Sequence, residues 1–285
     1  MAQRPEIAKS VITGIFATNY HDVGTGFPLL MLHGSGPGVS AWANWNKVFP
    51  LLSSDHRIIA PDLVGFGYTD RPEGMTYNMD VWTRQVIDLM NALGLEQADV
   101  VGNSFGGALA LALAVKHPAR VRKMVLMGSM GVSFPLSYGL DRVWGYTPSL
   151  ANMQELIGIF AYNFKMMPSE LARGRYEGSM QPGFQESFSA MFPAPRQSGV
   201  EAMAQNEIYL KEVRHHTLIV HGREDRVIPL ETSMKLIQML ENAQLHVFGK
   251  CGHWTQIERT QEFAVLVHNF LTIDPPYVQK ESGHP

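Results

Sequence analysis

The segment Gly102-Asn103-Ser104-Phe105-Gly106 places a serine between two glycines at a spacing that suits nucleophilic catalysis. An apolar run precedes it and a helix-forming run follows, so the serine is expected on a tight turn between a strand and a helix. Such a turn is strained, and a side chain at either flanking position would collide with it, which is why glycine is needed there. The alternative is a glycine-rich turn that only packs a helix on a strand.

Two residues that could complete a nucleophilic site follow Ser104 in the chain. A serine hydroxyl is a weak nucleophile until a base removes its proton, and the base needs a partner that fixes its tautomer. Asp225 lies in the segment HGRED at 221–225, and His253 lies in the segment CGHW at 251–254. Each segment follows an apolar run that predicts a strand, and the carboxyl ends of parallel strands converge on one crevice. The order Ser104, Asp225, His253 therefore predicts a catalytic triad.

Three other residues compete for roles in this site. Glu224 is the neighbour of Asp225, and the sequence favours Asp225 without excluding Glu224. Asp62 also follows an apolar run, but it precedes the serine and sits in a Pro-Asp turn with glycines close by, which favours a structural role. Cys251 is too close to His253 in the chain for an easy thiol-imidazole pair, and no second cysteine or H-E-x-x-H motif could complete a zinc site. We expect a small buried residue there, and no metal or other cofactor.

A glycine-rich segment, HGSGPG at 33–38, follows the apolar run at 29–32. Attack by a serine requires preorganised N–H donors that face the oxygen on which negative charge develops. We assign those donors to the backbone of Ser35, in this segment, and of Phe105, next to the nucleophile. A phosphate-binding loop is the alternative, but the spacing matches neither G-x-G-x-x-G nor the Walker pattern.

The elements that must position these residues alternate between β-branched apolar runs and helical periodicity, which predicts a mostly parallel sheet flanked by helices. An antiparallel pair of strands is expected over 11–20, and further strands over 29–32, 57–60, 98–101, 122–128, 217–220 and 245–248. The segment 105–115 is apolar on almost all sides and predicts a helix packed against the sheet. Apolar residues at helical spacing predict two more helices, from Met234 to Leu240 and from Phe263 to Leu271.

The long stretch between residues 132 and 214 does not continue this alternation of strands and helices. Apolar residues at helical spacing from Leu150 to Phe164, and prolines that divide the rest into short pieces, predict a helical insertion. Long insertions of this kind are usually functional lids. We therefore expect a core domain formed by 1–131 and 215–272, a cap over it at 132–214 and a frayed tail at 273–285.

Composition limits the classes of partner. The chain has 285 residues, of which 45% are hydrophobic and 17% charged, and its formal net charge is -3. These values fit an ordinary globular protein and leave no basic excess for nucleic acid. The N-terminus lacks the apolar stretch of a signal peptide, and no apolar run is long enough to cross a bilayer. With a single cysteine, we expect a soluble cytoplasmic protein that acts on a small molecule, without a membrane partner, and that could form a homo-oligomer.

A larger set of motifs resembles one known family over nearly the whole chain. The HGSGPG segment, Asn44-Trp45, GNSFGG at 102–107 and GHW at 252–254 are similar to those of the meta-cleavage product hydrolases of bacterial aromatic degradation, which have the α/β-hydrolase fold. In the predicted cap, GVSFP at 131–135, WGYTP at 144–148 and GFQESF at 183–188 look most like the 2-hydroxymuconate semialdehyde hydrolases and relatives that act on alkyl ketone analogues. A triad alone is common to many hydrolases, whereas this larger set is much more specific.

The resemblance implies a carbon-carbon bond hydrolase acting on ketonic substances. Its substrate would be a 2-hydroxy-6-oxo-2,4-dienoate, and its products 2-hydroxypenta-2,4-dienoate and a small carboxylic acid. Conversion of the dienol to its keto form would give the electrons of the broken bond a carbonyl group to move into. His253 would shuttle protons, and Ser104 would be the nucleophile of an acyl-enzyme route, with direct attack by water as the alternative.

By the same resemblance, Arg175 in the cap would bind the substrate carboxylate, with Asn44, Asn103 and Trp254 orienting the dienoate. A guanidinium can donate two parallel hydrogen bonds to a carboxylate, which suits this role. Arg173 is close enough in sequence to be confused with Arg175, and an arginine on the cap surface is the alternative for either residue.

Selectivity is expected on the other side of the nucleophile, where the ketone substituent would enter a pocket. Met130, Val200 and Val227 are the candidates for its lining. Because Met130 is bulky and follows a strand end, we expect a preference for hydrogen, methyl or short alkyl groups over phenyl.

Two other functions use the same fold. A generic carboxylesterase would share the triad but would not need Arg175 and Asn103. A receptor of hydrolase fold would bind a small ligand, turn it over slowly and signal through movement of its cap. Dehalogenases and epoxide hydrolases are disfavoured, because they carry aspartate where Ser104 stands.

Overall fold

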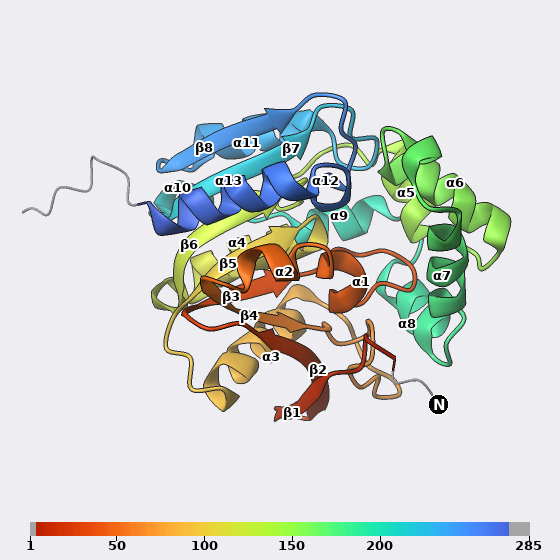
Figure 1. Cartoon of the computed structure of the whole chain (residues 1–285), viewed down its shortest axis with the longest axis horizontal. Coiled ribbons are helices and arrows are strands. Elements are labelled where there is room, and N and C mark those ends of the chain that lie inside the picture. The colour runs from red at the N-terminus through yellow and green to blue at the C-terminus, as the bar shows by residue number, and fades with distance from the viewer. Residues whose placement is uncertain (1–3, 274–285) are drawn as a thin grey trace, which may run out of the picture.

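A computed structural model describes residues 4–273, and an eight-stranded sheet forms its centre (Figure 1). The strands are β1 Lys9–Thr13, β2 Phe16–Val23, β3 Phe27–Leu32, β4 His56–Pro61, β5 Ala98–Asn103, β6 Val121–Met127, β7 His216–Gly222 and β8 Ala243–Phe248. They lie in the order β1-β2-β4-β3-β5-β6-β7-β8. β2 is antiparallel to both of its neighbours, and all other pairs are parallel. Every strand expected from the sequence is present, so the predicted α/β class is confirmed.

Helices cover both faces of the sheet, because successive residues of a buried strand point to opposite faces. Leu29 and Met31 of β3 belong to the apolar cluster with α1 (Ala41–Trp45), α2 (Phe49–Leu52) and α13 (Thr260–Thr272). Leu30 and Leu32 belong to the cluster on the other face, with α3 (Met79–Ala92), α4 (Phe105–Lys116) and α11 (Leu230–Met239). In Figure 1, α2 and α13 lie in front of the strands. The three predicted helices of the core are therefore confirmed as α4, α11 and α13.

One long helix, α3, has no counterpart among the predicted elements, although its sequence carries helix signals. Asn78 caps it, since its side chain accepts a hydrogen bond of 3.0 Å from the backbone N–H three residues later. Trp82, Val86 and Leu89 then recur at helical spacing and are buried against the sheet. The polar residues between them conceal this pattern.

The segment between β6 and β7 is helical, as predicted for the cap. Its helices are α5 Tyr138–Trp144, α6 Leu150–Phe160, α7 Ser169–Ser179, α8 Phe184–Met191, α9 Gln197–Met203 and α10 Glu207–Glu212. Helices α5 to α8 gather at one end of the molecule (Figure 1), whereas α9 and α10 contact α4, and α10 also contacts α11. The last part of this segment therefore lies on the core, and the boundaries 132–214 stay a prediction.

Two expectations concern the chain end and the membrane. The predicted frayed tail at 273–285 falls outside the described residues except for residue 273. Within the part of the chain that is described, none of the helices combines the length and the apolar character needed to cross a bilayer.

Candidate active site

Ser104 occupies the turn between β5 and α4 with a φ of 54°, in the left-handed region that residues other than glycine rarely adopt. The glycines on either side make this turn possible. A Cβ atom added at Gly102 would lie 2.3 Å from the carbonyl oxygen of Gly106, and one added at Gly106 would lie 2.3 Å from the carbonyl oxygen of Leu32. The strained serine distinguishes this turn from a glycine-rich turn that only packs a helix on a strand.

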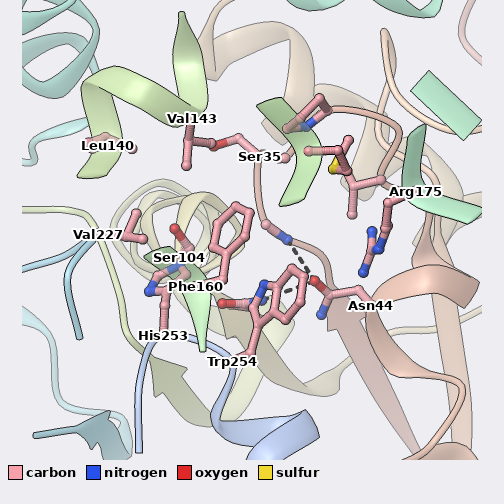
Figure 2. Close-up of a pocket in the computed structure, with 16 residues that line it drawn as sticks. Ser35, Asn44, Ser104, Leu140, Val143, Phe160, Arg175, Val227, His253 and Trp254 are labelled. Carbon is pink, nitrogen blue, oxygen red and sulfur yellow. Dashed lines mark hydrogen bonds between the residues drawn. The ribbon is translucent and has the colours of Figure 1, made fainter. Parts of the chain in front are cut away.

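His253 and Asp225 meet beside Ser104. Nδ1 of His253 lies 2.7 Å from Oδ2 of Asp225, and because a carboxylate can only accept, the imidazole proton is assigned to Nδ1. The lone pair on Nε2 is then available to a hydroxyl. Figure 2 shows Ser104 next to the imidazole in the wall of one pocket. Among the described residues no hydrogen bond joins the two, a contact that commonly tightens only when substrate binds.

Asp225 is held as an anion. Its Oδ1 accepts hydrogen bonds from the N–H groups of Val227 at 2.7 Å and Ile228 at 2.9 Å. Burial raises the pKa of Asp225, but its contacts with His253, His221 and Ile228 outweigh burial and bring the pKa below its ordinary value. An anionic partner stabilises the imidazolium that forms when His253 takes up a proton.

The residues that the sequence offers as alternatives to Asp225 and Ser104 have other roles in the structure. Oε2 of Glu224 accepts a hydrogen bond of 3.0 Å from the N–H of Cys251, so Glu224 holds this loop rather than the imidazole. Asp62 is fully buried and accepts hydrogen bonds from the side chain of Asn19 and from two backbone N–H groups, which gives it the structural role expected. The thiol of Cys251 is buried, and burial raises its pKa to about 12. A thiol with that pKa stays protonated and is a poor nucleophile.

His33 has a structural role. Its Nε2 accepts a hydrogen bond of 3.0 Å from the N–H of Leu63, so its proton is on Nδ1, which donates to the carbonyl oxygen of Gly34 at 2.8 Å. Burial lowers the pKa of His33 to about 4. The neutral ring therefore joins the glycine-rich segment at 33–38 to the loop that follows β4.

We expect this buried ring to make the fold sensitive to mild acid. Because the pKa of His33 is about 4 in the folded chain against 6.5 for an ordinary histidine, the unfolded chain binds more protons between these values. The stability that depends on neutral His33 is complete above pH 6.5 and is lost as the pH falls toward 4. In urea unfolding near pH 7 and near pH 5, His33→Gln should reduce this fall in unfolding free energy by up to about 1.4 kcal/mol per pH unit. An equally steep fall in the variant would contradict this role.

The two predicted oxyanion donors are the backbone N–H groups of Phe105 and Ser35. Phe105 is the first residue of α4, where a backbone N–H has no acceptor within the helix. The hydroxyl of Ser35 accepts a hydrogen bond of 3.0 Å from the indole N–H of Trp144 in α5. A Cβ at Gly38 would lie 2.6 Å from the backbone nitrogen of Ser179, so α7 packs directly on the same loop. The cap therefore holds the loop that carries Ser35.

Asn44, Asn103 and Trp254 line the pocket together, as expected of residues that orient a ligand. Nδ2 of Asn103 donates a hydrogen bond of 3.0 Å to Oδ1 of Asn44. The remaining amide atoms, Nδ2 of Asn44 and Oδ1 of Asn103, are buried without a partner among the described residues. Buried polar atoms are nearly always paired, so these two are available to a bound molecule. The ring of Trp254 stacks on Phe160 at 4.5 Å and gives the pocket a flat wall.

Arg175 reaches into the same pocket from α7, whereas Arg173 is exposed on the cap surface. Nη2 of Arg175 donates a hydrogen bond of 2.8 Å to the carbonyl oxygen of Ala43, and its guanidinium carbon lies 5.4 Å from the ring centre of Trp254. Burial lowers the pKa of Arg175 to about 10, so it remains a cation at neutral pH. No carboxylate within the described part of the chain forms an ion pair with it. Its charge is left for a bound anion.

The opposite end of the pocket is apolar, and the structure corrects part of the prediction there. Val227 lines it as expected. Met130 and Val200, which are buried with 0% and 1% of their surfaces exposed, are not among the residues that line it. Their places in the wall are taken by residues of α5 and α6, namely Leu140, Val143, Met153 and Phe160. The apolar spacing of α6 was a usable signal, but which of its faces meets the core cannot be read from the sequence.

A carboxylate that the sequence does not reveal ties the loop of His253 to the cap. Oε1 of Glu258 accepts a hydrogen bond of 2.7 Å from the N–H of Gly252, and Oε2 accepts one of 2.9 Å from the N–H of Tyr162. The N–H of His253 itself donates to the carbonyl oxygen of Phe160 at 2.7 Å. The position of the imidazole is therefore coupled to the end of α6.

Comparisons with known proteins agree with this geometry. Residues 28–260 match the family described as alpha/beta hydrolase fold. A 2-hydroxymuconate semialdehyde hydrolase of Pseudomonas sp. (strain CF600) is 57% identical over 267 residues, which cover 94% of each chain. A 2-hydroxy-6-oxo-2,4-heptadienoate hydrolase of Pseudomonas putida (strain F1) is 54% identical over 94% of this chain and 98% of the other. A solved meta-cleavage product hydrolase from Pseudomonas fluorescens IP01, a serine-to-alanine mutant complexed with acetates, has a TM-score of 0.93 and 54% identity, covering 94% of this chain and 98% of that one.

Proposed function

The chain belongs to the α/β-hydrolase fold family, among the meta-cleavage product hydrolases, and from this premise we propose that it hydrolyses the carbon-carbon bond of 2-hydroxy-6-oxo-2,4-dienoates. The substrates would be 2-hydroxymuconate semialdehyde and its short alkyl ketone analogues. The observation that carries the proposal is one pocket with a strained serine beside a His-Asp pair and, at one end, a half-buried cation without an ion-pair partner among the described residues. The proposal includes a cytoplasmic location, which suits a chain with a single cysteine.

In the proposed reaction the substrate first changes from its dienol to its keto form, as a proton moves from the 2-hydroxyl group to the carbon next to the ketone. His253 takes the proton of Ser104, whose oxygen then attacks the ketone carbon. The N–H groups of Ser35 and Phe105 stabilise the oxyanion. The carbon-carbon bond breaks, its electrons flow through the conjugated chain into the 2-keto oxygen, and the proton on His253 passes to the departing dienolate, which gives 2-hydroxypenta-2,4-dienoate and neutral His253. Water, activated by His253, then releases the acid from the acyl-enzyme.

The two ends of the pocket divide the substrate between them. Arg175 would bind the carboxylate through two parallel hydrogen bonds, and the free amide atoms of Asn44 and Asn103 would bind the neighbouring oxygen. The flat ring of Trp254 would lie against the conjugated chain. The apolar end, bounded by Val227 and by the side chains of α5 and α6, would receive the ketone substituent. The apolar end offers no partner for a carboxylate, so the substrate would bind in one orientation.

The activity itself can be followed by colour. We expect the purified protein to bleach the yellow dienolate of 2-hydroxymuconate semialdehyde and of its methyl ketone analogue, releasing 2-hydroxypenta-2,4-dienoate with formate or acetate. The phenyl ketone should have a kcat/KM on the order of 100-fold lower, because Phe160 and the aliphatic side chains around it leave the apolar end little room for a second ring. Spectrophotometry gives the rates and chromatography the acids. A clear preference for the phenyl ketone would refute the assignment of the substituent pocket, and no bleaching would refute the function.

A further inference from the structure

A second cavity lies on the far side of Arg175 from the catalytic pocket. It runs between α1 of the core and α7 of the cap, and it encloses about 1110 Å³ counting its open mouth, against about 510 Å³ for the catalytic pocket. A space of that size can hold a small organic acid. Arg175 and Asn44 line both cavities, so these two side chains separate them.

Arg175 spans the boundary between the two cavities. It stands on α7, and its Nη2 donates to the carbonyl oxygen of Ala43 on α1 at 2.8 Å, so it connects the cap to the core. Figure 2 shows Arg175 and Asn44 on the side of the catalytic pocket away from Ser104 and His253. One hydrogen bond to a backbone carbonyl and the contact with the Trp254 ring hold the guanidinium in place, so rotation of this long side chain would open the boundary beside Asn44.

The lining of this outer cavity suits a flat acid. Trp42 and Phe184 supply aromatic surface, and Lys47 adds a second cation to the guanidinium at the inner end. Glu6 and Glu170 line it as well, so the cavity as a whole has no excess of positive charge. The basic group that it shares with the catalytic pocket is therefore the one that would guide a carboxylate from one space to the other.

We propose that the outer cavity between α1 and α7 is the binding and exit site of the conjugated carboxylate product. This inference rests on the proposed function. When the carbon-carbon bond breaks, the acyl group stays on Ser104, and the dienoate is free with its carboxylate at Arg175. The acyl group and the helices α5 and α6 occupy the other end of the pocket, so the route past Arg175 is the one that does not cross the acyl-enzyme. The dienoate leaves along this route before water attacks the ester.

A removable plug in the outer cavity tests this exit. Gly174 lines the cavity, lies exposed on α7 and has no heavy atom within 4 Å of an added Cβ, so Gly174→Cys leaves room for a label. The native Cys251 is buried and shielded from the reagent. After modification with benzyl methanethiosulfonate, the dissociation rate of 2-hydroxypenta-2,4-dienoate should fall on the order of tenfold or more, as measured by rapid dilution of its complex with the full-length protein. Removal of the label with dithiothreitol should restore the rate.

Gly158→Cys is the matched control, because Gly158 is also a cap glycine with open space around an added Cβ, and it lies on α6 away from the outer cavity. Its labelled form should release the dienoate at a rate within about twofold of the unlabelled form. Lys47→Cys, exposed on the core side of the cavity, supplies a second plug if Gly174→Cys does not fold. The proposal is overturned if labels at 174 and 47 leave release unchanged, or if the label at 158 slows it equally. Bleaching of the dienolate by the unmodified protein tests the proposed function separately.

Discussion

Ser104→Ala is expected to lower kcat for 2-hydroxymuconate semialdehyde by on the order of 10⁴-fold or more while substrate still binds. Alanine removes the attacking oxygen but occupies the same backbone position, with φ at 54°, at no more steric cost than serine. The Asp225–His253 pair, the oxyanion donors and the polar end of the pocket remain in place. Stopped-flow absorbance should therefore show a change in the spectrum of the bound chromophore without the bleaching that follows cleavage.

The control for this result is Ser198→Ala. It removes an exposed hydroxyl that donates to the carbonyl oxygen of Pro195, and it should leave turnover unchanged. If Ser104→Ala keeps more than about 1% of the wild-type kcat, the serine is not the attacking group, and direct attack by water activated by His253 replaces the acyl-enzyme route.

The meeting of Ser104, Asp225 and His253 could be predicted because each residue follows a strand that the sequence indicates. β5 and β7 contain apolar runs and β8 alternates apolar and polar residues, and Ser104, Asp225 and His253 follow these strands. In a parallel sheet, residues that follow the strands lie together at the carboxyl edge of the sheet, so their place in the sequence predicts their place in the structure. The choice between Asp225 and Glu224 is different, because two neighbouring side chains point in different directions and only the folded structure shows which one contacts the imidazole.

The apolar end of the pocket could not be predicted in the same way, because it forms where the cap meets the core. Met130 follows β6 and Val200 lies on α9, so both are close in sequence to elements of the site. Neither lines the pocket, whose apolar wall is formed by Val227 and by residues of α5 and α6 that belong to the same buried cluster. Which face of a cap helix points down depends on the docking of the whole cap, a long-range property that local periodicity does not contain.

Glu258 illustrates the same limit for a polar residue. In the sequence it is one acidic residue among many near the start of the last helices. In the fold its carboxylate accepts hydrogen bonds from the His253 loop and from the chain after α6, two segments separated by about ninety residues. Burial raises the pKa of Glu258, which reflects how far it is withdrawn from water. No sequence motif predicts these two contacts, because each partner of Glu258 is a backbone N–H group, which any residue except proline supplies.

Arg175 is the residue on which the proposed substrate class depends most. The Ser-His-Asp arrangement serves esters and carbon-carbon bonds alike, so it does not separate the proposed hydrolase from a carboxylesterase. A half-buried guanidinium that faces the pocket without an ion-pair partner does separate them, because it favours a substrate that carries an anion. A neutral short ester has no group that could supply that pairing.

Arg175→Gln should therefore lower kcat/KM for 2-hydroxymuconate semialdehyde by about two to three orders of magnitude, since a charge-assisted bidentate contact is lost. Turnover of a neutral ester such as p-nitrophenyl acetate should fall far less, because the triad is untouched. Arg173→Gln is the matched control: the same change on the same helix, at an exposed position outside the pocket, should leave both activities unchanged. Equal losses for the dienoate and the ester, or equal effects of the two variants, would show that Arg175 supports the cap rather than the carboxylate, and the proposed orientation of the substrate would fail with it.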